Sequence, residues 1–344
     1  MKRFVIIAMA VAAAVSFAAE TAAPAAKPKA AKAPKAKKAE VMYAEEITYP
    51  CSFDNSMQPA LRRVAKTTDA PRPLFVVLHT WSANFRQCNG YARVLSAHDV
   101  HMIAPNFRGR NTVGNKLAMG SDAAVADVLD AVKYMKQNYK VDDSKIYLIG
   151  GSGGGFLSLL VSSRSRDIWA AVSSWCPISD LVAWHGYRMG NGYSAQIEKT
   201  IGNPQTDPKA KAEALHRSPV TYLEGVTFPL DISHGISDTT VPVCHAMYAF
   251  NKVAAPQDRF SAEDIEFISS KQQLPANYPE VQEKMGTVKI YLRRTSGNVR
   301  LTVFKGGHAI FSQIGIKWLL KQQKGKPADF STIDSKEKGS QLGR

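Results

Sequence analysis

The chain has 344 residues, 45% of them hydrophobic, which is enough to bury a large core and too apolar for a disordered protein. Its formal net charge is +15. Residues 1–40 hold eight Lys or Arg and two Glu, a net of +6 that leaves +9 for the rest. The rest contains no dense basic run, so the charge does not predict a nucleic-acid groove.

The N-terminus has the pattern of an export signal. Lys2 and Arg3 precede an apolar run at 4–17 that is too short to span a bilayer comfortably. We expect a signal peptide at 1–18, cleaved after Ala18, and a periplasmic or secreted protein. Residues 19–41, rich in Ala, Pro and Lys, are predicted to be a flexible tether. Its cations are either simply solvated or in weak contact with an anionic cell envelope.

Strands and helices are predicted to alternate over 42–323, followed by a loose polar tail at 324–344. An opening hairpin uses 46–49 and 59–64. The later strands are predicted at 73–78, 100–104, 145–149, 169–174, 228–233, 289–292 and 299–304, several as continuous apolar runs typical of strands covered on both faces. The main helices are predicted at 121–139, 153–165, 241–253 and 313–322. This order predicts a mostly parallel sheet with helices on both faces, with insertions near 177–227 and 254–286.

The motif Gly150-Gly151-Ser152-Gly153-Gly154 follows a predicted strand and precedes a predicted helix. It satisfies the G-x-S-x-G pattern of the α/β-hydrolase fold, in which a sharp turn holds the serine in a strained conformation between small neighbours. The turn presents the hydroxyl above the sheet edge, where a helix N-terminus stabilises negative charge. The stretch lacks the Lys-Ser/Thr of a phosphate-binding loop and the distant acid of a dinucleotide site. We therefore expect Ser152 to be a nucleophile.

A serine nucleophile needs a histidine base and an acid that orients it, and in this fold the acid precedes the histidine. His308, just past the last predicted strand, is the predicted base. Asp238, in the loop after the strand at 228–233, is the predicted acid. Asp180 competes but is also placed to be a helix N-cap, and Asp231 lies within its strand.

Backbone N–H groups should form the oxyanion hole. Gly153 is predicted to give one, and either Thr80 or Trp81 the other, whereas His79 is predicted to be a structural loop residue. In the first insertion, the aromatic residues predicted to line a substrate pocket are Trp184, Tyr187 and Tyr193, although burial in a core is the commoner fate of such side chains.

No metal or cofactor is expected. His98 and His101 form a lone H-x-x-H, a weak metal signal that fits two ordinary histidines better. The four cysteines are Cys51, Cys88, Cys176 and Cys244, an even number that permits two disulfides without requiring them. A bridge between Cys176 and Cys244 is considered because the two strands before them should be neighbours.

Together these residues resemble the catalytic domain of the prolyl oligopeptidase family of serine peptidases, over roughly residues 73–320. The resemblance rests on Asn106-Phe107-Arg108-Gly109, on the helix at 127–132, on the serine motif, on His234-Gly235-x-x-Asp238-x-x-Val241-Pro242 and on Gly307-His308. The chain departs from the family at Gly153, where an aromatic residue is common, and at His79-Thr80, where the family has His-Gly. The family's peptidases also carry an N-terminal β-propeller, and nothing before residue 73 is large enough to form one.

The prediction is an exported serine hydrolase that cleaves ester or peptide bonds through an acyl-enzyme. Carbohydrate or aryl esters are the favoured substrates, and the alternative is a serine-type peptidase like prolyl oligopeptidase. Outside enzymes, the alternative is a non-catalytic envelope-binding module on the same fold, disfavoured because every role of the triad is filled. The expected partner is a small-molecule, glycoside or peptide substrate and no nucleic acid; no oligomeric state is predicted.

Overall fold

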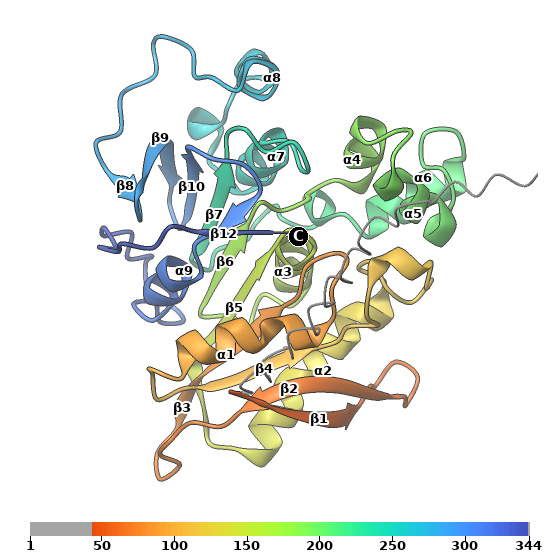
Figure 1. Ribbon diagram of the computed structural model, residues 1–344, viewed down its shortest axis with the longest axis vertical. Helices are drawn as coiled ribbons and strands as arrows, with labels where there is room; N and C mark the ends of the chain where they lie inside the picture. Colours follow the sequence, from red (N-terminus) through yellow and green to blue (C-terminus); the bar gives the residue numbers. More distant parts are fainter. Residues whose placement is uncertain (1–42, 343–344) are drawn as a thin grey trace, which may run out of the picture. The chain divides into compact units, whose positions relative to one another are not determined.

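The computed structural model describes residues 43–342 (Figure 1). The predicted signal peptide at 1–18 and tether at 19–41 therefore lie outside the described residues. In the described part, a ten-stranded sheet has the order β1-β2-β4-β3-β5-β6-β7-β10-β9-β8. Its strands are β1 (Glu45–Pro50), β2 (Met57–Arg63), β3 (Arg72–Leu78), β4 (His101–Pro105), β5 (Val141–Gly151), β6 (Ala171–Trp175), β7 (Leu230–Gly235), β8 (Lys284–Met285), β9 (Val288–Ser296) and β10 (Val299–Phe304).

The central strands β4, β3, β5, β6, β7 and β10 pair in parallel, and the strands at both edges pair antiparallel. The register aligns Gly150 with Leu78 and Gly151 with Trp175, so β3, β5 and β6 end at the same edge of the sheet. Gly235 is aligned with Phe304 at the ends of β7 and β10. The loops that follow these strands therefore emerge at one edge, where open parallel sheets bind their ligands.

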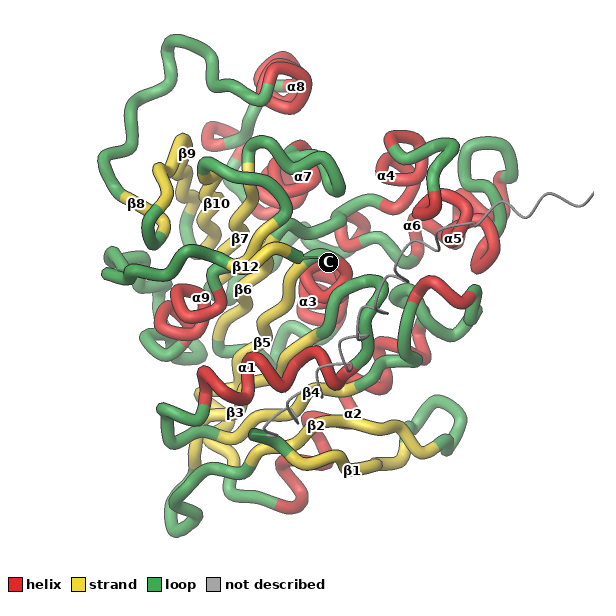
Figure 2. The backbone as a smooth tube through the Cα atoms, viewed as in Figure 1, coloured by secondary structure: helices red, strands yellow, loops and turns green. Residues whose placement is uncertain are grey.

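Helices cover both faces of the sheet (Figure 2). Along β3, alternate side chains enter two separate cores, because successive residues of a strand point to opposite faces. One core includes residues of α2, α3, α7 and α8, and the other includes residues of α1 and α9. The bounds of these helices are α1 (Asn89–Leu95), α2 (Asp122–Asn138), α3 (Gly153–Arg164), α7 (Cys244–Val253), α8 (Ala262–Lys271) and α9 (Ser312–Leu319). This architecture confirms the predicted α/β-hydrolase fold.

Helix α2 illustrates how local sequence sets these elements. Ser121 is its N-cap, and the Ser121 hydroxyl accepts a hydrogen bond from the Ala124 N–H at 3.2 Å. Asp122 adds a negative charge to the first turn, which the helix dipole favours. Val125, Val128 and their neighbours at helical spacing are buried against the sheet. The predicted helix at 121–139 is confirmed with nearly the same ends.

The two segments predicted as insertions interrupt the strand and helix alternation. The first contains α4 (Leu181–Tyr187), α5 (Gly192–Ile201) and α6 (Pro208–His216), which pack against one another. The second contains α8 and the short strand β8. Short 3-10 turns complete the described elements at Phe85–Cys88, Asn111–Val113, Pro219–Thr221 and Pro256–Asp258.

The C-terminal residues do not form the loose tail that was predicted. The Trp318 indole donates a hydrogen bond to the Asp329 carbonyl at 2.9 Å and stacks on the ring of Phe330. Further on, β12 (Ser340–Gln341) pairs antiparallel with β11 (Ala309–Ile310) as a separate two-stranded sheet. Figure 1 draws this C-terminal segment in dark blue. The polar composition of the segment predicted a loose tail, but individual contacts with residues far away in the sequence hold it in place.

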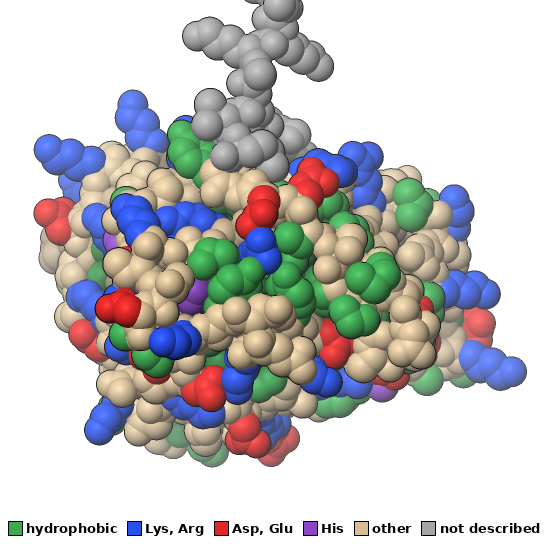
Figure 3. Space-filling view, turned by 90° about the horizontal axis from the view of Figure 1, so that it is seen from below, with side chains coloured by type: hydrophobic (Ala, Val, Ile, Leu, Met, Phe, Trp, Pro, Cys, Tyr) green, Lys and Arg blue, Asp and Glu red, His purple; other side chains and the backbone are tan. Residues whose placement is uncertain are grey.

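The described surface carries mixed charge. On the face drawn in Figure 3, Lys and Arg side chains are scattered among acidic and uncharged ones. No helix among residues 43–342 is both long and apolar enough to cross a membrane.

Candidate active site

Ser152 occupies a strained turn between β5 and α3. Its φ of 56° and ψ of −121° lie in a region that side-chain-bearing residues rarely adopt. The Ser152 N–H donates to the Trp175 carbonyl at 2.8 Å, and the Ser152 carbonyl accepts from the Phe156 N–H at 2.8 Å. These two bonds fix the turn from both sides.

The glycines around Ser152 are required by close packing. A Cβ on Gly150 would lie 2.4 Å from the backbone of Gly154, and a Cβ on Gly154 would lie 2.4 Å from the Leu78 carbonyl oxygen. These backbone atoms cannot move aside to make room for a side chain, so only glycine fits at both positions. The small residues that identified the motif in the sequence thus have a steric cause.

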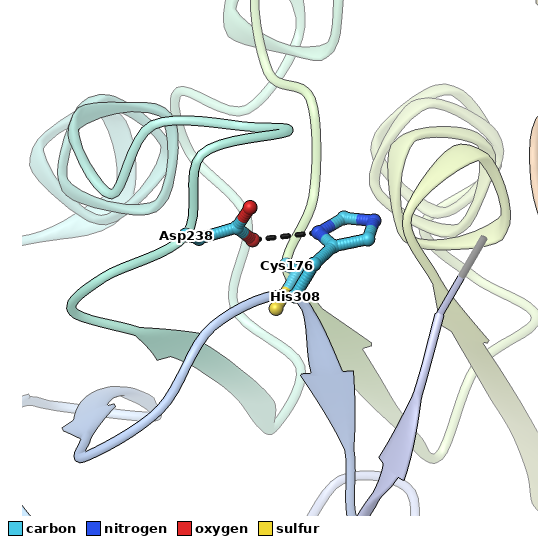
Figure 4. A group of neighbouring side chains, drawn as sticks. All are labelled: Cys176, Asp238 and His308. Carbon is cyan, nitrogen blue, oxygen red and sulfur yellow. Dashed lines mark hydrogen bonds and ion pairs between the residues drawn. The ribbon is translucent and has the colours of Figure 1, made fainter. Parts of the chain in front are cut away.

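His308 and Asp238 form a short, buried hydrogen bond (Figure 4). The His308 Nδ1 lies 2.6 Å from the Asp238 Oδ2 and donates to it, because a carboxylate only accepts. The His308 Nε2 is also buried, yet it has no hydrogen-bond partner among the described residues. With the proton on Nδ1, Nε2 presents a lone pair, as a general base requires.

Both oxygens of Asp238 are held. Its Oδ1 accepts from the Thr240 and Val241 N–H groups at 2.9 and 3.0 Å, and its Oδ2 lies 3.3 Å from the His234 Nε2 as well as near His308. Burial alone would raise the pKa of Asp238, but the hydrogen bonds from His234 and His308 hold that pKa well below its usual range. Asp238 is therefore a fixed anion beside the imidazole.

The two competing carboxylates are engaged elsewhere. Asp180 caps α4, accepting from the Val182 and Ala183 N–H groups, as the alternative role predicted for it requires. Asp231 forms a buried ion pair with Arg300 at 2.8 Å. Of the three acids considered, Asp238 alone is hydrogen-bonded to His308.

Cys176 lies beside this pair and was not predicted to do so. Its Sγ, an Asp238 oxygen and a His308 ring nitrogen all lie within 4.8 Å of one another (Figure 4). Burial, together with the nearby Asp238 charge, raises the pKa of the Cys176 thiol well above its usual value. Because the Asp238 carboxylate is already hydrogen-bonded to His308, these three side chains are better suited to proton transfer than to metal binding.

The considered disulfide between Cys176 and Cys244 is wrong. All four cysteines are free thiols. Cys176 belongs to the core that contains α1 and α9, whereas Cys244 packs against the core on the other face of the sheet. The two residues follow neighbouring strands, but their side chains lie on opposite faces of the sheet.

Trp81 and Gly153 bring two backbone segments side by side. A Cβ on Gly153 would lie 2.5 Å from the Trp81 nitrogen and 2.6 Å from its Cα. This contact explains why glycine stands where the family often has an aromatic residue. The Thr80 N–H donates to the Gln87 side chain at 2.9 Å, while the Trp81 N–H has no acceptor among the described residues. Of the two predicted donors, the geometry favours Trp81 over Thr80.

The loops behind the site are held by buried polar contacts. The ring nitrogens of His79 face the carbonyls of Thr80 and Asn106, and burial lowers the pKa of His79 to about 4. Arg108 pairs with the buried Asp127 at 3.0 Å, which ties its loop to α2. His79 thus has the contacts of a structural residue, as predicted.

The three aromatic residues predicted to line a pocket have different fates. Trp184 is only 1% exposed, donates to the Thr240 carbonyl and packs edge-on against Trp81, so it belongs to the core and its prediction as a stacking surface is wrong. Tyr193 is half-buried beside it. Tyr187 is 55% exposed. The Arg188 guanidinium lies near both tyrosine rings and donates to the Thr239 carbonyl, next to Asp238.

Comparison with known proteins places the chain in a family. The model described as the prolyl oligopeptidase family matches residues 87–264, slightly more than half of the chain. Dipeptidyl aminopeptidase BIII of Pseudoxanthomonas mexicana is 26% identical over 188 residues, 50% of this chain and 26% of that protein. Acetyl esterase Axe7A of Xylanibacter ruminicola is 26% identical over 128 residues, 37% of this chain and 28% of that protein. The chain thus spans only about a quarter of each of these relatives.

The solved structures show the same fold. The acylaminoacyl peptidase of Pyrococcus horikoshii superimposes with a TM-score of 0.52 and 14% identity, over 77% of this chain and 38% of that one. At this identity the likeness concerns the fold alone.

Proposed function

Since the chain belongs to the prolyl oligopeptidase family and is a serine hydrolase, we propose that Ser152, His308 and Asp238 perform its catalysis through an acyl-enzyme. The observation that carries this proposal is the asymmetry of His308. Its Nδ1 is bonded to Asp238 at 2.6 Å, and its buried Nε2 has no partner among the described residues. A buried polar atom without a partner is costly, and the Ser152 hydroxyl is the group proposed to satisfy it.

In the proposed reaction, His308 Nε2 takes the proton of Ser152 Oγ as the oxygen attacks the substrate carbonyl carbon. The carbonyl π electrons move to its oxygen, which the Gly153 and Trp81 N–H groups stabilise. The tetrahedral intermediate collapses, and His308 donates the proton to the departing alcohol or amine. Water, deprotonated by the same Nε2, then attacks the carbonyl carbon of the acyl-enzyme. The bond to Oγ breaks, Nε2 returns the proton to Ser152 Oγ, and the acid product leaves. Asp238 keeps the proton on Nδ1 and stabilises the imidazolium.

The favoured substrates are carbohydrate or aryl esters. Tyr187 is exposed and Tyr193 half-exposed on the insertion beside the Asp238 loop, and aromatic rings stack on sugars and aryl acids. A relative named acetyl esterase supports the ester class, whereas one named dipeptidyl aminopeptidase supports the alternative, a serine-type peptidase. Esters also release an alkoxide more easily than amides release an amine, which must be protonated.

A direct comparison separates these classes. The measurement is kcat/KM of the purified enzyme on feruloyl or acetyl glycosides and on proline-containing peptides, with Ser152→Ala as the control for contaminating hydrolases. We expect faster ester cleavage on natural substrates. A peptide preference of roughly tenfold or more, about 1.4 kcal/mol of transition-state binding, would favour the peptidase instead.

We also propose that the protein is exported. The support is the sequence at its N-terminus, where Lys2 and Arg3 precede the apolar run. Sequencing the N-terminus of the protein recovered from a periplasmic or culture fraction should find cleavage after Ala18. An uncleaved chain confined to the cytoplasm would contradict it.

A further inference from the structure

The C-terminal residues 337–342, here called the C-terminal strap, cross the edge of the sheet where the active site lies. Glu337 fixes the beginning of the strap. Its carboxylate accepts hydrogen bonds from the Gln313 and Ile314 N–H groups at 3.2 and 3.1 Å. The N-cap residue of α9 makes no side-chain hydrogen bond to the helix. Glu337 in the strap therefore accepts the hydrogen bonds from the first turn that a local capping residue would normally accept.

Two glycines allow the strap to pass. Gly339 has a φ of 79°, and a Cβ there would lie 2.8 Å from the Phe311 ring. Gly286 has a φ of 58°, and a Cβ there would lie 2.1 Å from the Glu337 carbonyl oxygen. Side chains at these positions would meet both a strained backbone and an occupied space. The path of the strap is thus specified by the residues around it.

The strap then pairs with the residues that follow His308. Its strand β12 is aligned with Ala309 and Ile310, the two residues directly after the histidine. The Leu342 N–H donates to the His308 carbonyl at 2.8 Å. On its other side, the loop of His308 is held by the acid loop, since the Ser237 N–H donates to the Gly306 carbonyl at 2.9 Å. His308 therefore sits between two backbone anchors, one of them supplied by the strap.

The strap also touches the turn that carries Ser152. The two methyl groups of Leu342 lie 2.9 and 3.1 Å from the place where Gly151 would carry a Cβ. The side chain of Leu342 thus packs on the residue directly before Ser152, while its backbone bonds to His308. A cavity of about 390 Å³ lies alongside, bounded by Thr80, Gly151 and the strap.

We propose that the C-terminal strap is a positioning element for proton transfer, with Leu342 holding the His308 backbone and the Ser152 turn at a fixed separation. This inference rests on the proposed catalytic roles of Ser152 and His308. Its physical basis is that the separation of the two backbones sets how far Oγ must move to reach Nε2, and a misplacement of about 1 Å costs about 100-fold in rate.

The test compares four changes in the full-length enzyme on an activated ester. They are truncation after Lys338, Leu342→Ala, Leu342→Met and, as a matched control on an exposed neighbour, Lys336→Ala. We expect the truncation to lower kcat by about 10- to 100-fold with KM changed less than about threefold. Leu342→Ala should lose less, Leu342→Met should recover most of the loss, and Lys336→Ala should match the parent enzyme.

Two further readouts separate positioning from a merely structural role. The rate of phosphonylation by a fluorophosphonate, normalised to the folded fraction from circular dichroism, should fall in parallel with kcat. The downfield proton resonance of the His308 Nδ1–H should broaden or shift in the truncated enzyme. A folded, truncated enzyme with unchanged kcat and an unchanged resonance would overturn the proposal. Activity retained in Ser152→Ala would instead overturn the catalytic assignment itself, so the two failures are distinguishable.

Discussion

The two sides of the His308 imidazole differ in how completely they are bonded. On the acid side, Asp238 receives hydrogen bonds from two backbone N–H groups and from His308, with His234 adjacent. On the other side, Nε2 has no partner among the described residues, and Ser152 is held in a strained turn. The acid side therefore fixes charge and orientation, and the other side is left available for a proton.

This difference predicts how the site fails when each side is altered. If the proposed roles are right, changes at Ser152 should remove the chemistry, and changes at Asp238 should leave the groups in place with the proton on the wrong nitrogen of His308. Changes in the packing behind the acid should affect stability more than rate.

The largest effect is expected from Ser152→Ala. Removal of the nucleophile should lower kcat by about 10⁵- to 10⁶-fold, because only substrate binding and the oxyanion hole remain. The measurement is kcat/KM on an aryl ester. Ser162→Ala, which alters a buried serine of α3 whose hydroxyl donates to a backbone carbonyl, is the matched control and should retain activity. Comparable activity in Ser152→Ala would contradict the assignment.

Asp238→Asn should come next. The amide keeps the size of the carboxylate but removes the charge that holds the proton on the His308 Nδ1, and a loss of about 10⁴-fold in kcat is expected. Asp180→Asn serves as the control because asparagine also caps helices, so activity should be preserved. If the two variants lost activity equally, Asp238 would have no special role.

Gly153→Ala tests the oxyanion side. The added methyl would meet the Trp81 backbone at 2.5 Å and should push apart the two segments whose N–H groups are proposed to bind the oxyanion. We expect a loss of about 10²- to 10³-fold in kcat, as for removal of one oxyanion donor. Gly90→Ala, where a methyl meets nothing within 4 Å, is the control. An active, folded Gly153→Ala enzyme would require a different donor pair.

The smallest effect concerns the packing behind the acid. His245 is 1% exposed, and burial, with the nearby His234, lowers its pKa to about 3. In the unfolded chain His245 takes up a proton near pH 6.5, but in the folded chain it stays neutral until the pH approaches 3. The contribution of the neutral His245 to the unfolding free energy is therefore complete above pH 6.5 and is lost as the pH falls toward 3. At pH 5, the loss is about 2 kcal/mol of unfolding free energy.

The measurement is chemical denaturation of the parent protein and His245→Leu at pH 7.5 and pH 5. The fall in unfolding free energy between the two pH values should be smaller in the variant by about this amount. Equal falls in both proteins would show that His245 is not kept neutral by the fold.

The pairing of His308 with Asp238 could be predicted from the sequence, because both residues follow the ends of parallel strands in a fixed chain order. The choice between Thr80 and Trp81 could not, because it depends on where the Gln87 side chain hydrogen-bonds. The prediction that Trp184 lines a pocket was wrong for a similar reason, because the sequence does not show which other ring will pack over an aromatic residue in a polar insertion.

The C-terminal strap shows most clearly what cannot be predicted from the sequence. Its composition is that of a loose tail, and its order depends on Glu337 reaching α9 and on Leu342 reaching Gly151, contacts between residues far apart in sequence. Hydrophobic periodicity cannot reveal single contacts of this kind.

The central claim is that Ser152 is the nucleophile activated by His308, and a fluorophosphonate probe tests it most directly. Labelling the parent enzyme, followed by peptide mapping, should yield a single adduct on Ser152, with slower labelling in Asp238→Asn and none in Ser152→Ala. An adduct on another residue, or labelling that persists in Ser152→Ala, would contradict the account.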